Sequence, residues 1–88
     1  MEYHCRIILV EDDEDDYILF SDFISEMRDI RVELTWVSHY DEAIGVISGN
    51  QYDLCFLDYR LGERTGLELL KEPIVNNSSG PFIFLTGQ

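Results

Sequence analysis

Carboxylate side chains stand directly after two apolar stretches of this chain, and their type and spacing could support shared chemistry. Glu11 and Asp12 follow the apolar residues 7–10, and Asp58 follows the apolar residues 54–57. Carboxylates that approach within a few ångströms raise each other's pKa values or require a cation between them. Because the ligands on offer are oxygen atoms, the cation that suits such a site is Mg²⁺. The sequence therefore indicates an acidic metal site, provided that the fold brings these residues together.

The acidic run at residues 11–16 also has a simpler explanation. Negative side chains in the first turn of a helix are stabilised by the helix dipole by about 0.3–1 kcal/mol each, and Asp13 is placed to start such a helix. Asp58 favours the functional interpretation, because a carboxylate at the end of an apolar strand is costly unless it is solvated or paired. We therefore assign Asp13 to the helix start and keep Glu11, Asp12 and Asp58 as the candidate site.

Four short segments have the composition of the β-strands that would position these residues: 7–10, 32–36, 54–57 and 82–85. Three of them are continuously apolar, which is typical of central parallel strands covered by helices on both faces. Residues 32–36 alternate apolar with polar side chains, which predicts an edge strand with one wetter face. Within that segment, we interpret Trp36 as a core or dimer-surface residue.

Helical patterns separate the predicted strands. A first helix over residues 13–27 should turn one apolar side toward the core, formed by Phe20, Phe23, Ile24 and Met27. A second, shorter helix carries Ala43, Ile44 and Ile47. A third begins near Gly66, and Pro73 should stop or kink it because proline removes a backbone donor.

The alternation of strands and helices predicts an α/β fold, with a parallel sheet and right-handed crossovers. In doubly wound sheets, functional groups collect beyond the carboxyl ends of the strands. That edge would bring together Glu11, Asp12 and Asp58, and it would also receive Thr86 and Gly87 after the last predicted strand.

Composition limits the possible partners and the location. The 88 residues form one domain, 1–88, and 18 acidic against 6 basic residues give a net charge of −12. This charge repels phosphate backbones and anionic lipids, so we expect no direct nucleic-acid binding and no membrane association. No apolar run exceeds four residues, which predicts a cytoplasmic protein without a membrane span. Cys5 and Cys55 should remain separate thiols, because their positions on the predicted strands differ by about 10 Å along the strand direction, too far for a disulfide.

Several matched pieces together resemble a response-regulator receiver domain of two-component signalling. They are residues 8–13, residues 57–61, Gly66 and residues 84–87, at the spacing typical of that family. The resemblance covers essentially the whole chain. It implies a flavodoxin-like doubly wound parallel sheet with strand order 2-1-3-4.

The resemblance also implies a role for each matched residue. Asp58 would be the phosphoacceptor, taking a phosphoryl group from a histidine kinase or a phosphotransfer protein. Glu11, Asp12, the Asp58 carboxylate and the backbone carbonyl of Arg60 would hold Mg²⁺, which neutralises charge during the transfer. Thr86 would be the switch hydroxyl that turns toward the bound phosphoryl group. The protein would not be an enzyme beyond Mg²⁺-dependent self-phosphorylation and autodephosphorylation.

Two departures from the family pattern keep an alternative open. The chain stops at Gln88, so we expect it to lack the family's fourth helix, fifth strand and fifth helix, and to expose residues 82–85 as an edge prone to self-association. The family's phosphoryl-contacting lysine has no counterpart either, because the only lysine, Lys71, falls in the third predicted helix. The alternative function is therefore a receiver-fold interaction module, or a fragment, that is not phosphorylated.

Overall fold

A parallel four-stranded sheet forms the centre of the protein. The computed structural model describes residues 3–49, 51–78 and 80–85. The strands are β1 (Tyr3–Val10), β2 (Ile30–Val37), β3 (Leu54–Asp58) and β6 (Phe82–Leu85), in the order β2-β1-β3-β6. Since β6 is the fourth of the predicted strands, the predicted order 2-1-3-4 is confirmed. The alternating segment does form an edge strand, β2.

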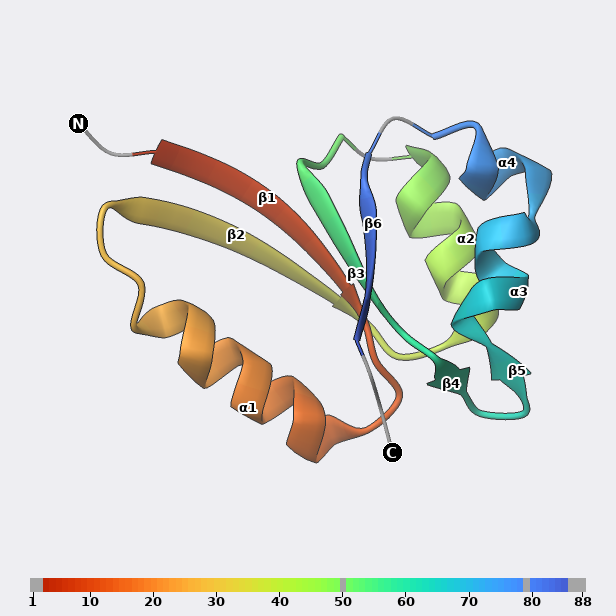
Figure 1. Ribbon diagram of the computed structural model, residues 1–88, viewed down its shortest axis with the longest axis horizontal. Helices are drawn as coiled ribbons and strands as arrows, with labels where there is room; N and C mark the ends of the chain where they lie inside the picture. Colours follow the sequence, from red (N-terminus) through yellow and green to blue (C-terminus); the bar gives the residue numbers. More distant parts are fainter. Residues whose placement is uncertain (1–2, 50, 79, 86–88) are drawn as a thin grey trace.

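The helices cover the two faces of the sheet unequally (Figure 1). Of the helices that the structure describes, α1 (Glu14–Ser25) lies on one face, whereas α2 (Tyr40–Gly49), α3 (Gly66–Lys71) and α4 (Pro73–Asn76) lie on the other. The main core fills the space between the sheet and these three helices, and consists of Ile8, Val10, Val37, Tyr40, Ala43, Ile47, Tyr52, Cys55, Leu57, Leu61, Leu69 and Val75. None of the described helices has the length and the apolar character needed to cross a lipid bilayer.

The predicted core side of α1 is wrong in part. Phe23 is 64% exposed and Met27 is 40% exposed, although both were expected to face the core. The half-buried side of α1 instead contains Tyr17, Phe20 and Ile24. Aromatic contacts set this orientation, because Phe20 meets the ring of Phe56 on β3 at 5.1 Å between centroids. Among the described residues the helix has only the sheet to pack against, so one narrow side of it is half-buried and none of its residues is fully buried.

The register of the strands brings their carboxyl ends level. Val10 pairs with Val37 on β2 and with Leu57 on β3, so the next residues of β1 and β3 are Glu11 and Asp58. The apolar half of β1 that pairs on both sides is fully buried, whereas its first half pairs only with β2 and is more exposed. Cys55 pairs with Ile8 rather than with Cys5, and both thiols are free, as predicted.

Local sequence signals end and connect the helices. Asp13 caps α1 by accepting a hydrogen bond from the Asp15 backbone N–H at 2.9 Å, which confirms its assignment to the helix start. Pro73 does stop the third predicted helix: α3 ends at Lys71, and α4 begins with the proline in its first turn. Between β3 and α3, a short antiparallel hairpin of β4 (Arg60–Leu61) and β5 (Arg64–Thr65) replaces a plain loop.

Strand β6 pairs on one side only within the part of the chain that the structure describes. Its neighbour is β3, and Ile83 and Phe84 remain 40% and 38% exposed. The continuous apolar composition of this segment predicted a central strand, and that prediction is wrong for the described residues. The exposed edge expected from the absence of the family's fifth strand is present.

A tyrosine anchors the connection from α4 to β6. The Tyr52 hydroxyl lies 2.7 Å from Ser78 Oγ and accepts a hydrogen bond from the Gly80 backbone N–H at 3.2 Å. The Tyr52 ring lies so close to Gly80 that a Cβ atom at this position would overlap it. Position 80 therefore requires glycine because of a close approach.

We expect Gly80→Ala to lower the free energy of unfolding by about 1–3 kcal/mol, because the new methyl group forces Tyr52 to move. Gly45→Ala in α2 is the matched control, since a Cβ there meets open space. That variant should raise stability by about 0.5–1 kcal/mol through helix propensity. Urea unfolding of both variants measures the difference, and a Gly80→Ala midpoint equal to the wild-type midpoint would contradict the expectation.

Candidate functional site

Three carboxylates meet at the carboxyl edge of the sheet. Glu11 and Asp12 follow β1, Asp58 ends β3, and one carboxylate oxygen from each residue lies within 4.8 Å of the others. Glu11 is only 4% exposed, Asp58 is half-buried and Asp12 is exposed. The predicted convergence is confirmed, and the cluster opens to solvent on the side of Asp12.

Burial and crowding change the protonation of Glu11. Desolvation is the main cause that raises its pKa, from an ordinary 4.5 to about 8, and a hydrogen bond with the Asp58 carboxyl group and the charges of Asp58 and Asp16 add to the increase. The Asp13 backbone N–H, which donates to Glu11 Oε2 at 3.2 Å, acts in the opposite direction. Without a cation, the raised pKa therefore favours the protonated form of Glu11 beside Asp58.

The donor set fits Mg²⁺. All three side chains offer oxygen atoms, the buried carboxylate needs either a proton or a positive charge, and exposed Asp12 leaves room for bound water. Glu11, Asp12 and Asp58 are the residues that would hold the ion.

The hairpin after Asp58 closes one side of the cluster. The Gly62 backbone N–H donates to Asp12 Oδ2 at 3.0 Å, and Gly62 has a positive φ of 68°, which favours glycine. At the base of the hairpin, the Gly66 N–H donates to the Tyr59 carbonyl at 2.7 Å. A Cβ at Gly66 would lie 2.5 Å from the Asp58 carbonyl oxygen, so only glycine permits this approach. The hairpin thus orients Asp12 and packs directly on Asp58.

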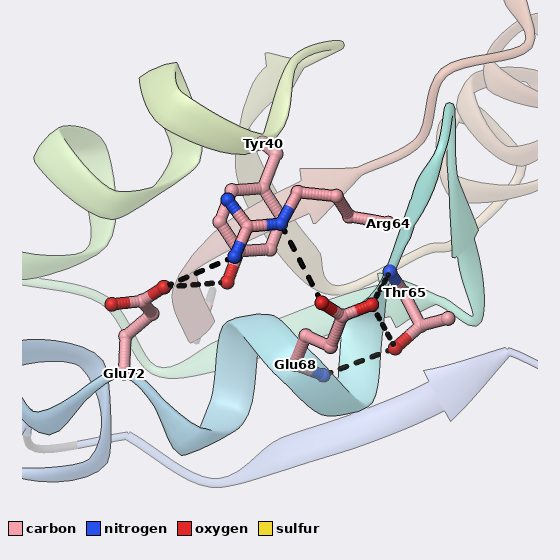
Figure 2. Close-up of polar contacts among 5 residues, drawn as sticks. All are labelled: Tyr40, Arg64, Thr65, Glu68 and Glu72. Atoms are coloured by element: carbon pink, nitrogen blue, oxygen red, sulfur yellow. Dashed lines mark hydrogen bonds and ion pairs between the residues drawn. The ribbon is translucent and has the colours of Figure 1, made fainter.

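A second group of polar contacts fixes this hairpin to the helices (Figure 2). The Arg64 guanidinium lies over the Tyr40 ring, with Cζ 3.9 Å from the ring centroid, and Figure 2 shows Glu68 and Glu72 on either side of it. Its ion pairs with these residues measure 3.6 and 3.8 Å. The Tyr40 hydroxyl donates a hydrogen bond to the Glu72 carboxylate at 2.6 Å. Burial is the main cause that raises the pKa of Tyr40 to about 12, and this hydrogen bond is the second. Thr65 and Glu68 form a capping box at the start of α3.

On the opposite side, β2 supports the cluster. The indole Nε1–H of Trp36 donates to the Glu11 backbone carbonyl at 2.8 Å, and the Glu11 N–H donates to the Val37 carbonyl at 3.0 Å. Sequence reasoning missed both Trp36 and Gly62. For Trp36 the available signal was its place as the last residue of the predicted strand 32–36, at the same edge as the carboxylates.

The remaining predicted site residues have different outcomes. Thr86 lies outside the described residues. Arg60 stands in β4, where it pairs with Thr65, and its carbonyl as a metal ligand stays a prediction. Lys71 is the last residue of α3 and is exposed.

The model of the response regulator receiver domain family matches residues 7–88. No curated protein sequence matches the chain at a significant level.

Solved structures of receiver proteins superpose on most of the chain. The non-phosphorylated HemR receiver domain from Leptospira biflexa is 34% identical, with a TM-score of 0.73 over 96% of this chain and 65% of that one. The MaeR response regulator bound to beryllium trifluoride is 18% identical, with a TM-score of 0.80 over 96% and 68%. A response regulator from Burkholderia pseudomallei with a phosphorylated aspartic acid and a calcium ion is 15% identical, with a TM-score of 0.62 over 96% and 49%. The chain thus spans about half to two thirds of each of these proteins.

The raised pKa of Glu11 predicts a pH-dependent stability. Between pH 4.5 and about 8 the folded state binds more protons than the unfolded state, so this contribution to stability is complete below pH 4.5 and is lost as the pH rises through about 8. We expect the free energy of unfolding without divalent cations to fall across this window, and Glu11→Gln to remove the fall. Saturating Mg²⁺ should also reduce this fall of the free energy of unfolding with pH, because the cation replaces the proton.

Urea unfolding in chelator at pH 5, 7 and 9 tests this expectation. Glu14→Gln is the matched control, because it makes the same substitution at an exposed residue in the first turn of α1, outside the carboxylate cluster. Identical pH profiles for Glu11→Gln and wild type would show that Glu11 does not hold the proton.

Proposed function

The chain belongs to the response regulator receiver domain family, and from this premise we propose that Asp58 accepts a phosphoryl group in a two-component phosphorelay. The observation that carries the proposal is the convergence of Asp58 with Glu11 and Asp12 at the carboxyl edge of the sheet. Of the three carboxylates, Asp58 ends a strand and is half-buried, so it is held in place while its carboxylate remains within reach of a phosphodonor.

The proposed reaction moves one phosphoryl group. A carboxylate oxygen of Asp58 attacks the phosphorus, a P–O bond forms, and the P–N bond of a phosphohistidine breaks with the electron pair leaving on the imidazole nitrogen. The product is an aspartyl phosphate. A bound Mg²⁺ supplies neutralisation of the charge on the transferring group. Glu11, Asp12 and the Arg60 carbonyl would complete its ligand set with Asp58, and Thr86 would serve as the switch hydroxyl.

A histidine kinase or a phosphotransfer protein is the proposed donor, in the cytoplasm. The net charge of −12 argues against direct nucleic-acid binding. The catalytic contribution of the chain would be limited to its own phosphorylation and to hydrolysis of the aspartyl phosphate.

One observation favours a second candidate function, an interaction module that is not phosphorylated. The only lysine of the chain, Lys71, ends α3, and the Arg64 guanidinium is engaged by Glu68, Glu72 and the Tyr40 ring. Lys71 thus lies at the opposite end of α3 from Gly66, which packs on Asp58, and the Arg64 side chain is already paired with acidic side chains.

Beryllofluoride, a phosphoryl analogue, discriminates between the two functions. With Mg²⁺ it should stabilise the wild-type chain against thermal unfolding, by about 2.7 kcal/mol at a hundredfold excess over its Kd. Asp58→Asn should abolish this effect, because the analogue loses its acceptor. Asp22→Asn, at an exposed position of α1, is the control and should respond like the wild type. No stabilisation of the wild type by beryllofluoride and Mg²⁺ would favour the interaction module.

We also propose that the β6 edge binds a second copy of the chain. An edge strand presents unpaired N–H and C=O groups, and here Ile83 and Phe84 add partly exposed apolar side chains. Ile83→Lys should give a monomer at micromolar concentration in analytical ultracentrifugation, whereas wild type and Ile74→Lys should associate. Ile74 on α4 is 54% exposed, so the same substitution there leaves the edge unchanged. A wild-type monomer at these concentrations would exclude this interface.

A further inference from the structure

The backbone of Glu11, the one buried carboxylate of the cluster, is held at both of its polar groups by the end of β2. Its N–H donates to the Val37 carbonyl at 3.0 Å, and its carbonyl accepts from Trp36 Nε1–H at 2.8 Å. The first bond links backbone to backbone and does not depend on the type of side chain at Val37. The second exists only because residue 36 carries an indole.

The indole itself is held by α1. The rings of Trp36 and Tyr17 stack at 4.1 Å between centroids, with 5° between their planes. Tyr17 belongs to the first turns of α1, and its N–H donates to the carbonyl of Asp13, whose own N–H donates to Glu11 Oε2. The ring of Trp36 therefore contacts the start of the helix while its N–H binds the end of the strand. The two contacts are made at Glu11 and Tyr17, so the segment between them is residues 12–16, which begins with Asp12 of the cluster.

This hydrogen bond sets the direction of the chain between two of the acidic residues. The carbonyl of Glu11 and the N–H of Asp12 belong to one planar peptide unit. Fixing the Glu11 carbonyl therefore fixes that plane, and with it the direction in which the chain proceeds to Asp12. Gly62 holds the Asp12 side chain itself, because its backbone N–H donates to Asp12 Oδ2.

We propose that Trp36 is a positioning residue of the acidic site, which aligns Glu11 and Asp12 for a divalent cation through its indole N–H. The inference rests on the proposed function, because it assumes that these carboxylates bind Mg²⁺. Trp36 does not touch the ion. It acts through the backbone of Glu11, and since it is the only tryptophan of the chain, its indole also reports on the site spectroscopically.

Trp36→Phe separates this role from simple packing. Phenylalanine keeps a ring that can stack on Tyr17 but has no N–H to donate. We expect the Kd for Mg²⁺, measured by titration calorimetry, to increase about three- to tenfold, the size expected from the loss of one neutral hydrogen bond. Phe20→Leu is the matched control, because it removes the other aromatic contact between α1 and the sheet. It should lower the melting temperature and leave the Kd unchanged.

A measurement on the wild-type chain covers the case in which Trp36→Phe does not fold. The single indole N–H resonance should shift on addition of Mg²⁺ alone, and the shift should disappear in Asp58→Asn. An indole resonance that stays in place while Mg²⁺ binds would overturn the proposal, and so would a folded Trp36→Phe with the wild-type Kd. Absence of Mg²⁺ binding to the wild type would instead refute the metal site of the proposed function.

Discussion

The crowding of carboxylates at one edge of the sheet is the constraint on which the site depends. Glu11 is buried beside Asp58, and its desolvation and the repulsion between the two carboxyl groups raise its pKa. A cation relieves the same cost, because it neutralises both groups at once. The site is therefore electrostatically unfavourable without a positive charge and prepared to accept one. This property follows directly from the level strand ends, since Val10 and Leu57 are paired neighbours.

Such a repulsive cluster has to be held by the surrounding structure. The apolar strands β1 and β3 anchor Glu11 and Asp58 in the core, and the Gly62 N–H of the β4–β5 hairpin donates to Asp12. The stack of Arg64 on Tyr40 ties that hairpin to α2. On the other side, β2 and the first turns of α1 hold the Glu11 backbone. Each support comes from a different element, so the carboxylates cannot separate without disturbing packing or hydrogen bonds elsewhere.

The two faces of the sheet contribute unequally to stability. Three helices bury the main core on one face, whereas α1 has no buried residue and leaves Leu19 and Phe23 largely exposed on the other. Burial of apolar surface contributes about 25 cal/mol per Å², so the main core carries most of the stabilisation. The acidic site lies where these two layers meet at the carboxyl edge. Tyr17 and Trp36 connect the first turns of α1 to the backbone of Glu11 at this edge.

The sequence patterns predicted the strand segments and the acidic residues at their ends, and the family resemblance of the sequence implied the strand order. Apolar runs and alternation are local patterns, and the rule that ligands gather at the carboxyl ends then places Glu11, Asp12 and Asp58 on one edge. Tertiary structure decided the rest. The burial of Glu11, the bonds from Trp36 and Gly62, and the side of α1 that faces the sheet depend on contacts between residues 25 to 50 positions apart. Local sequence patterns do not predict such contacts, because these contacts form only when the register of the strands and the rotation of the helix are set together.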